Sequence, residues 1–501
     1  AFHDQPKAPA QSFLVLPARR STHHLSSGAR WNKLGTLFLI NPITMNSGPL
    51  ILTCLIALSP PSTHAGIRAG AAEQEITPRA GLEIQHYFRK SIGVRDPLFA
   101  RCLYLEDTTG NAVAIVGLDL IMASFETCDE LRAEIREKCG VKNTLLNFSH
   151  THASAALGPR GRSTVSNDEG SQWNDHTLDS IIAVVAKARK QAEPASLRAG
   201  RAKVQVGYNR RLTNTRNGQV FMGVNRMGPA VPWVNVLVAD SLRTSKPLAV
   251  LFEHAAHPVI VPHTSKLTSA DFPGAAGKRI REILGDDVIT VFGQGCGGNI
   301  NGFPLRSTHE KAEEAGRRLG EASLKAIQES RRITASLLTV KSTTVTLPSA
   351  PLPDRELLAE MMDLEKHNED RMKQLRRIEY LLEEGKQPPG RRFDAHAVML
   401  GREWCLTAMP HEMFCQYELW IDKHAPFRTT MTFAFTNGYE GYVAVDKALA
   451  LGARGGYEAG RLPNWGGQVY SRHLGPPAVG AEKIVKRALS SLWPSETLPP
   501  K

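Results

Sequence analysis

The chain has 501 residues, of which 42% are hydrophobic and 22% are charged, a composition typical of a globular protein with a sizeable core. The formal net charge is +12, but residues 1–65 alone hold five Lys or Arg against Asp4. The rest of the positive charge is spread thinly over residues 66–501. No dense basic cluster with interleaved aromatic residues occurs in the sequence, which argues against nucleic acid as a partner. The net positive charge is compatible with weak attraction of the protein to an anionic membrane surface.

Residues 1–65 are predicted to lie outside the folded domain. Residues 1–44 are rich in Ser, Pro and Arg, and Met45 precedes an apolar run over residues 50–58 that ends in small residues. A run of this length is too short to span a bilayer and fits a secretory signal peptide at about 45–65. We therefore expect Met45 to be the true start, residues 1–44 to be upstream sequence, and the protein to be secreted or periplasmic. The alternative is a buried core segment.

From residue 66 onward, apolar strand-like runs alternate with helix-like runs. Strands are predicted over 102–105, 112–118, 144–148, 248–252, 288–292, 404–409 and 430–435. Helices are predicted over 126–138, 177–191, 275–284, 310–333 and 481–492. This alternation predicts an α/β fold, a mixed β-sheet core flanked by helices, in a single catalytic domain over 66–495. The highly charged residues 353–390 are predicted to form a helical insertion.

The cysteines that follow residue 65 are expected to be scattered buried thiols. Once Cys54 of the expected signal peptide is set aside, the chain contains Cys102, Cys128, Cys139, Cys296, Cys405 and Cys415, without a Cys-x-x-Cys pair or zinc-ribbon spacing. Their even number permits disulfides in an exported protein, but a chain of this size does not need them.

His150 and His152 follow the apolar run over residues 143–148. A strand places side chains at i and i+2 on one face, so both imidazoles are expected to leave the strand on the same side. Because neutral imidazole is a common metal ligand, the pair is a candidate for half of a metal site. The alternative is two exposed histidines where a loop begins.

Further polar residues follow other apolar strands. His257 precedes Pro258 and is either a ligand or a capping or core histidine. Glu412 is either a helix-start anion or the third ligand of a His/His/Glu zinc site. Tyr442 closes the segment Asn437-Gly-Tyr-Glu-Gly-Tyr442, where tyrosines are more often packing residues.

The segment Gly293-Gln-Gly-Cys-Gly-Gly298 formally matches the dinucleotide-binding pattern G-x-G-x-x-G. That pattern requires a helix directly afterwards, and the following Asn299-Ile-Asn-Gly-Phe-Pro304 does not begin one. We expect a tight loop that brings backbone N–H groups and Asn side chains to a site.

Taken in order, these segments resemble the catalytic domain of the neutral/alkaline (non-lysosomal) ceramidases over about residues 70–460. The resemblance is carried by Glu75-Ile-Thr-Pro78, Val94-Arg-Asp-Pro-Leu-Phe-Ala-Arg101, Asp119-Leu120, Ser149-His-Thr-His152, Asn209-Arg210, His257-Pro258, residues 294–301, Pro410-His-Glu412, residues 437–442 and Tyr457-Glu458. Their common order indicates shared ancestry.

The resemblance implies a zinc-dependent amidohydrolase of the N-acylsphingosine type. By position, the zinc ligands of the family fall on His150, His257, Glu412 and Tyr442. His152 corresponds to a histidine that assists the zinc-activated water and shuttles a proton to the leaving amine. Arg210 and Tyr457 correspond to groups that steady the substrate carbonyl or its oxyanion.

The sequence departs from the family pattern at three points. Asn301 stands where the family has a serine in Asp-x-Ser-Pro; asparagine is not a nucleophile, so a zinc–water mechanism survives and a serine acyl-enzyme does not. His411 replaces the usual glycine before the glutamate. The chain is expected to lack the C-terminal immunoglobulin-like domain of the family.

The expected function is hydrolysis of an amide in a ceramide-like lipid or another N-acyl small molecule, with Zn²⁺ as cofactor. Two alternatives stand beside it. The first is a zinc esterase or another amidohydrolase acting on a non-sphingolipid substrate. The second, motivated by Asn301, is a non-catalytic binding protein derived from the family. The sequence indicates no oligomeric state.

Overall fold

The computed structural model describes residues 66–84, 89–162, 168–460 and 475–495. The predicted signal peptide, the start at Met45 and the upstream residues 1–44 lie outside them and stay predictions.

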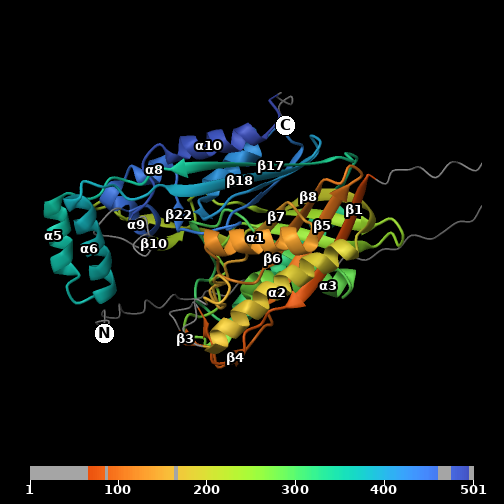
Figure 1. Ribbon diagram of the computed structural model, residues 1–501, viewed down its shortest axis with the longest axis horizontal. Coiled ribbons are helices and arrows are strands. Elements are labelled where there is room, and N and C mark those ends of the chain that lie inside the picture. The colour runs from red at the N-terminus through yellow and green to blue at the C-terminus, as the bar shows by residue number, and fades with distance from the viewer. Residues whose placement is uncertain (1–65, 85–88, 163–167, 461–474, 496–501) are drawn as a thin grey trace, which may run out of the picture. The chain divides into compact units, whose positions relative to one another are not determined.

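A mixed sheet of nine strands forms the larger half of the core (Figure 1). Its path is β14 (Ile289–Gln294), β12 (Pro247–His254), β11 (Trp233–Ser241), β8 (Glu193–Lys203), β1 (Ile67–Glu75), β5 (Phe99–Asp107), β6 (Ala112–Leu118) and β7 (Thr144–Phe148), with β16 (Arg331–Ile333) paired to β8. The pairs β12/β14 and β6/β7 are parallel, and the other pairs are antiparallel. The predicted mixed sheet is therefore confirmed.

A second, four-stranded sheet packs face to face on the first. It is made of β17 (Leu338–Leu347), β18 (Arg391–Leu400), β19 (Trp404–Ala408) and β21 (Thr429–Phe433), and β19 and β21 are parallel. Leu251 and Val291 of the first sheet share one buried cluster with Leu406 and Phe433 of the second. Burying apolar faces of both sheets removes apolar surface from water, which is the main force that holds them together.

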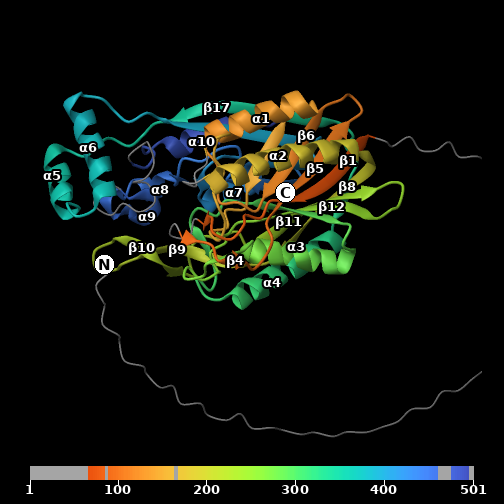
Figure 2. The ribbon, with the colours of Figure 1, turned by 60° about the horizontal axis from the view of Figure 1, so that its bottom comes forward.

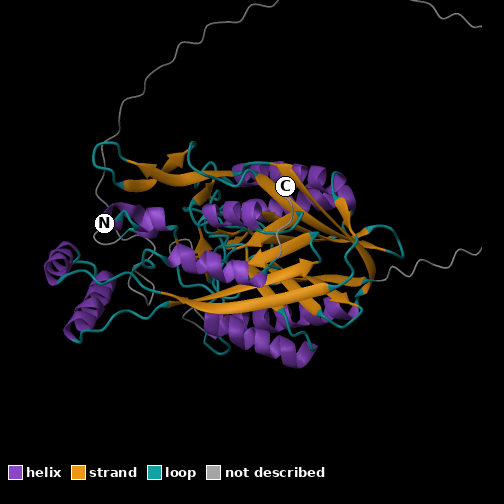
Figure 3. Ribbon diagram, turned by 90° about the horizontal axis from the view of Figure 1, so that it is seen from above, coloured by secondary structure: helices purple, strands orange, loops and turns teal. Residues whose placement is uncertain are grey.

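Helices cover the outer faces of both sheets, as Figure 3 shows from above. The larger sheet carries α1 (Phe125–Cys139), α2 (Asp168–Lys190), α3 (Asp271–Leu284) and α4 (His309–Gln328), and the smaller carries α7 (Cys415–His424) and α10 (Ala481–Leu492). Phe272 and Ile280 of α3 share a buried cluster with Leu319 of α4 and Val236 of β11. The order of layers is helix, sheet, sheet, helix, which confirms the α/β fold with flanking helices.

The charged segment between β17 and β18 forms two helices, α5 (Arg355–Leu364) and α6 (Glu369–Glu383). Asp354 and Asn368 cap them by accepting hydrogen bonds from backbone N–H groups, as the first turn of a helix requires. The pair has a small core of its own that includes Leu358 and Ile378. Its helical character agrees with the prediction.

Short elements complete the domain near the ends of these sheets. They are β2 (Glu83–Ile84), β3 (Arg89–Lys90), β4 (Gly93–Val94), β9 (Gly207–Thr213), β10 (Val220–Asn225), β13 (Leu267–Thr268), β15 (Ile300–Gly302), β20 (Glu412–Met413), β22 (Tyr442–Val443), α8 (Asp446–Leu449), the 3₁₀ helix Gly452–Gly455 and α9 (Gly456–Ala459). β9, β10 and β15 form a three-stranded sheet, and β20 pairs with β22.

Two predicted elements differ from the observed ones. The helix predicted over 310–333 ends at Gln328, and residues 331–333 instead form β16 along the edge of β8. The helix predicted from residue 177 already begins at residue 168. The six cysteines of the described part of the chain are free and buried, as predicted. Within the described ranges, no helix combines the length and the apolarity needed to cross a membrane.

Candidate active site

The predicted site residues lie where strands of both sheets end. His150 follows β7, His257 follows β12, and Glu412 follows β19. Asn147 of β7 holds the end of its own strand against the ends of two neighbouring strands, because its Nδ2 donates to the Ala434 carbonyl at 2.6 Å and its Oδ1 accepts from the Gln294 N–H at 2.7 Å. One buried amide thus joins the ends of β7, β14 and β21.

His150 and His152 come together for a different reason from the one expected. β7 ends at Phe148, and His150 adopts a left-handed backbone conformation with φ of 63°, so strand alternation does not direct either ring. The predicted strand geometry was wrong, although the predicted proximity is real. The two ring centroids lie 4.9 Å apart. A positive φ at a residue with a Cβ is a local strain that only the surrounding structure can maintain.

The tautomer of His150 suits a metal ligand. Its Nδ1 lies 2.8 Å from the Ile121 carbonyl oxygen, which can only accept, so Nδ1 carries the proton and Nε2 keeps its lone pair. Burial lowers the pKa of His150 to about 4, although the charge of Glu412 acts in the opposite direction. The imidazole is therefore neutral at physiological pH, the form that binds metals.

His257 is held in the same way by another main-chain oxygen. Its Nδ1 donates to the Gly297 carbonyl at 2.6 Å, so its Nε2 also presents a lone pair. That Nε2 lies 2.7 Å from Glu412 Oε2, and His150 Nε2 lies 3.8 Å from the same oxygen. Three lone-pair donors facing one another need a positive charge between them, which a proton or a metal ion can supply.

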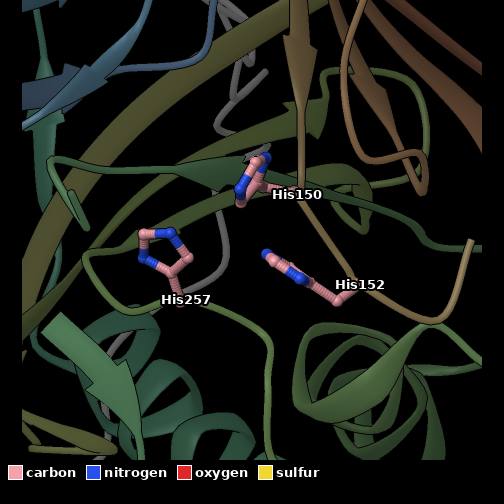
Figure 4. Close-up of side chains that lie close together, drawn as sticks. All are labelled: His150, His152 and His257. Atoms are coloured by element: carbon pink, nitrogen blue, oxygen red, sulfur yellow. The ribbon is translucent and has the colours of Figure 1, made fainter. Parts of the chain in front are cut away.

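The three histidines converge, as Figure 4 shows. His150, His152 and His257 each offer one ligand atom, and these atoms all lie within 4.8 Å of one another. His150 and His257 are buried, whereas His152 is partly exposed. We call His150, His257 and Glu412 the metal side. The imidazole of His152 lies beside them and retains access to solvent.

Glu412 is anionic in this setting. Burial raises its pKa, but the neighbouring His150 and His257 lower it further, so the pKa falls to about 2. Its second oxygen, Oε1, accepts a hydrogen bond of 2.7 Å from the hydroxyl of Tyr439. Tyr439 was not among the predicted site residues, although it lies within the quoted segment over residues 437–442.

Tyr442 lies next to Glu412 through the backbone, because β20 and β22 pair in parallel with Glu412 opposite Tyr442. Its ring centroid is 5.7 Å from that of Tyr457 and 5.4 Å from the Arg210 guanidinium carbon. Burial and the Glu412 charge raise the pKa of Tyr442 well above its ordinary value. The phenol is therefore neutral unless a cation stabilises its anion.

Arg210 anchors the opposite side of the site. It is 5% exposed; its Nε donates to Glu458 Oε1 at 2.7 Å and its Nη1 to Asn301 Oδ1 at 2.9 Å. Within the described ranges, Nη2 is buried without a hydrogen-bond partner. Arg211 also binds Glu458, at 2.6 Å. This set, {Arg210, Asn301, Glu458}, is called the arginine side below; Glu458 was not predicted as a site residue, although the quoted Tyr457-Glu458 contains it.

The glycine-rich segment after β14 is a tight loop without a following helix, as predicted. Its contribution differs from the expectation. The N–H groups of residues 295–298 all donate to partners inside the protein, so they do not serve a ligand. Asn299 caps the start of α7 through the Cys415 N–H. What the loop supplies to the site is the Gly297 carbonyl.

A groove of about 520 Å³ lies elsewhere, between α3, α4 and the residues around β5. None of the predicted site residues lines it. Its wall carries paired charges, including Arg101 with Asp119. The groove is therefore separate from the histidine cluster.

Comparisons with known proteins place the chain by its fold. No family model matches the sequence, and no curated protein matches it either. The neutral ceramidase from Pseudomonas aeruginosa is similar in structure with a TM-score of 0.61, at 15% sequence identity, over 87% of this chain and 76% of that one. A ceramidase complexed with C2 is similar with a TM-score of 0.62, also at 15% identity, over 87% of this chain and 77% of that one.

All the predicted site residues lie in one connected neighbourhood, since the charge of Arg210 also acts on His150 and on Glu412. The resemblance drawn from the sequence segments agrees with the structural similarity. At 15% identity this similarity establishes the architecture and leaves the reaction to be argued from the residues. The chain has the fold of neutral ceramidase.

Proposed function

We propose that the protein is a zinc-dependent hydrolase that cleaves the amide bond of a ceramide-like or related N-acyl lipid. The observation that carries the proposal is the convergence of His150, His257 and Glu412 at strand ends in a ceramidase fold. Two imidazoles and a carboxylate form a typical catalytic zinc set.

The donor atoms fit a divalent metal. Both Nε2 lone pairs face Glu412 Oε2, and both Nδ1–H groups are fixed by carbonyl oxygens, an arrangement that orients ligating histidines. Tyr442 would be the fourth protein ligand. Zinc bound there would supply Lewis acidity and lower the pKa of a water molecule towards neutrality.

Other residues of the chain would stabilise negative charge on the substrate and transfer the proton. Arg210 keeps its charge because the carboxylates of Glu458 and Glu412 oppose the effect of burial, and its free Nη2 can donate to an oxygen on which negative charge develops. His152, partly exposed beside His150, is placed to carry a proton to the leaving amine. Tyr457, with its ring centroid 5.7 Å from the Arg210 guanidinium carbon, would assist Arg210 at the same oxygen.

Asn301 has a supporting part in this scheme. Its Oδ1 accepts from Arg210 Nη1, so it directs the guanidinium and leaves Nη2 for the substrate. An amide side chain forms no acyl-enzyme, so attack by an activated water is the route compatible with this residue.

Metal analysis and a substrate panel test the proposal together. Purified protein is expected to hold about one zinc per chain, and His150→Ala is expected to lose the metal and the hydrolysis. His424→Ala, at an exposed histidine of α7, is the matched control. The panel holds a ceramide, a short-chain N-acyl amine, a carboxylic ester and a phosphoester. Turnover of the ester alone would favour the esterase alternative, and absence of zinc and of any turnover would overturn the proposal.

Export through residues 45–65 belongs to the same proposal. Expression of the chain with and without these residues in a bacterial host, followed by N-terminal sequencing of the protein outside the cytoplasm, tests it. A mature N-terminus close to Gly66 is expected; retention of the whole chain inside the cell would contradict export.

A further inference from the structure

The hairpin of β9 and β10 exposes an unusual set of apolar side chains. Phe221 is 46% exposed, Met222 39%, Val224 44% and Met227 95%. Phe221 and Met222 are consecutive in a strand and so point to opposite faces, which means that both faces of β10 are exposed here. β10 is also the end strand of its sheet, and among the described residues no strand pairs with its outer edge. Exposed apolar side chains gathered within one short segment mark interaction surfaces.

The same hairpin carries only positive charge. No Asp or Glu occurs anywhere from Pro194 to Ala239. Arg216 lies in the turn between the strands and Arg226 follows β10, and both are exposed. The Arg454 guanidinium lies beside the turn, where a Cβ on Gly218 would be 3.1 Å from its Nη1. The surface made by Phe221, Met222, Val224, Met227, Arg216 and Arg226 is called the hairpin surface below.

The base of the hairpin is a wall of the candidate active site. β9 carries Arg210 and pairs with β15, which places Tyr208 opposite Asn301. On its other side, β10 packs against α9, where a Cβ on Gly456 would be 2.7 Å from the Val220 carbonyl oxygen. α9 carries Tyr457, which is 40% exposed. Figure 2 shows the hairpin next to α9, extending away from the two main sheets.

We propose that the hairpin surface docks the protein on an anionic lipid bilayer. Phe, Met and Val side chains enter the boundary between headgroups and acyl chains, and arginines beside them bind anionic headgroups. Because the hairpin carries no carboxylate, it offers no charge complementarity to a second copy of itself. That the bilayer also supplies the substrate rests on the proposed function; the binding itself does not.

Docking is a property of the surface, so it is measured without turnover. The full zinc-loaded chain is sedimented with vesicles of phosphatidylcholine alone, or of phosphatidylcholine and phosphatidylglycerol in equal parts, at low and high salt. We expect binding to the mixed vesicles that weakens with salt, since each basic residue near an anionic surface contributes a factor of about five.

Two double variants divide the surface into its apolar and charged parts. Phe221→Ser/Met222→Ser and Arg216→Ser/Arg226→Ser are each expected to weaken vesicle binding by at least about tenfold. Leu364→Ser, at a residue 64% exposed in α5, is the apolar control, and Lys341→Ser on β17 is the charge control. Circular dichroism checks that every variant folds.

The outcomes separate docking from catalysis. In support, the hairpin variants lose hydrolysis of vesicle-embedded ceramide but keep turnover of a water-soluble short-chain N-acyl amine, and His150→Ala keeps vesicle binding. Retained vesicle binding with no hydrolysis by any form would leave docking standing and overturn the proposed function. Equal vesicle binding by wild type and both hairpin variants would overturn docking. So would a dimer in solution that only the hairpin variants dissociate.

Discussion

The metal side and the arginine side of the site are held by different kinds of contact. On the metal side, the Nδ1 atoms of His150 and His257 are fixed by main-chain carbonyls of Ile121 and Gly297. On the arginine side, Arg210 is fixed by the side chains of Glu458 and Asn301.

The two kinds of contact respond differently to single substitutions. Main-chain carbonyls remain when a side chain is exchanged, so the histidine tautomers depend on the fold as a whole. A carboxylate that neutralises a buried guanidinium can be removed by one substitution, and the remaining charge then has no compensation. We expect the metal side to be disrupted only when a ligand is replaced. The arginine side should be disrupted when a neighbouring side chain is replaced.

Replacing a ligand is expected to have the largest effect. Glu412→Gln removes the anion that faces both Nε2 atoms, so zinc affinity falls and hydrolysis drops by at least about a thousandfold, roughly 4 kcal/mol of barrier. Zinc content and kcat/KM check this. Glu360→Gln, at an exposed position of α5, is the control. Full zinc occupancy and near-normal turnover in Glu412→Gln would remove Glu412 from the ligand set.

Breaking the arginine side is expected to cost stability as well as activity. Glu458 is 2% exposed and pairs with both Arg210 and Arg211. Glu458→Gln removes the carboxylate that pairs with both guanidinium groups, at a cost of about 3 kcal/mol in the free energy of unfolding. Urea unfolding measures the cost.

Adding Arg210→Met to Glu458→Gln should recover part of this loss, because the uncompensated guanidinium is gone. Asp363→Asn breaks the exposed pair of Asp363 with Lys366 and is the control, at under about 1 kcal/mol. If Glu458→Gln were as mild as that control, the buried pair would contribute no more than an exposed one.

Behind the metal side, a buried carboxyl pair supports the loop that holds His257. Glu253 and Glu418 are 0% and 1% exposed, and a Cβ on Gly295 would lie 2.4 Å from Glu253 Oε1 and 2.8 Å from Glu418 Oε2. Within the described part of the chain, the Oε1 atoms of both have no donor as carboxylates. Burial first, and then the Glu418 charge, raises the pKa of Glu253; burial also raises that of Glu418, against Arg201 and the Cys296 N–H. One shared proton satisfies both side chains.

The free energy of unfolding should therefore decrease as pH rises. The native pair keeps a proton that the unfolded carboxyls lose near their ordinary pKa of about 4.5, so the free energy of unfolding falls as pH rises from there towards neutrality, by on the order of 2 kcal/mol. Urea unfolding over this range measures the slope. Glu418→Gln mimics the protonated acid and should flatten it; an unchanged slope would assign the pH dependence to other groups.

The sequence predicted the parts of the fold that are locally distinctive. Largely apolar, buried runs such as β7 and β14 were found, but β8, β11 and β18 were not predicted. β8 contains Pro194 and Gly200 and alternates with half-exposed polar residues, so its strand character comes from its neighbours in the sheet. The end of α4 was placed too late because pairing of residues 331–333 with β8 prevails over helix propensity.

The candidate site was predicted from a resemblance, and the structure explains what local pattern could not supply. Glu412 and Tyr439 are 27 residues apart in the sequence, and their hydrogen bond depends on the pairing of β20 with β22. Glu458 lies far along the chain from Arg210, and no spacing rule relates them. The left-handed conformation of His150 follows from the surrounding fold, so strand periodicity misjudged it.

Substitution of His411 is expected to have the smallest effect, and it tests how far the metal side depends on side chains. His411 has φ of 67°, its Nε2 donates to the Arg392 carbonyl at 2.8 Å, and its Nδ1 accepts from the Glu440 N–H at 3.0 Å. It thus fastens the loop that carries Tyr439 next to Glu412. His411→Gly relieves the backbone strain but removes both bonds, so the free energy of unfolding should change by no more than about 1 kcal/mol.

Zinc affinity of His411→Gly should nevertheless fall by about tenfold, because the groups that orient ligands are worth this much. Competition with a chelator measures it, and His411→Asn, which tolerates the left-handed conformation and has a shorter reach, should lie between. Zinc affinity of His411→Gly equal to wild type would show that main-chain contacts alone hold the metal side. The contrast between the two sides would then be complete. A large loss would show that the metal side, like the arginine side, depends on a neighbouring side chain, and that the positive φ at His411 is maintained for it.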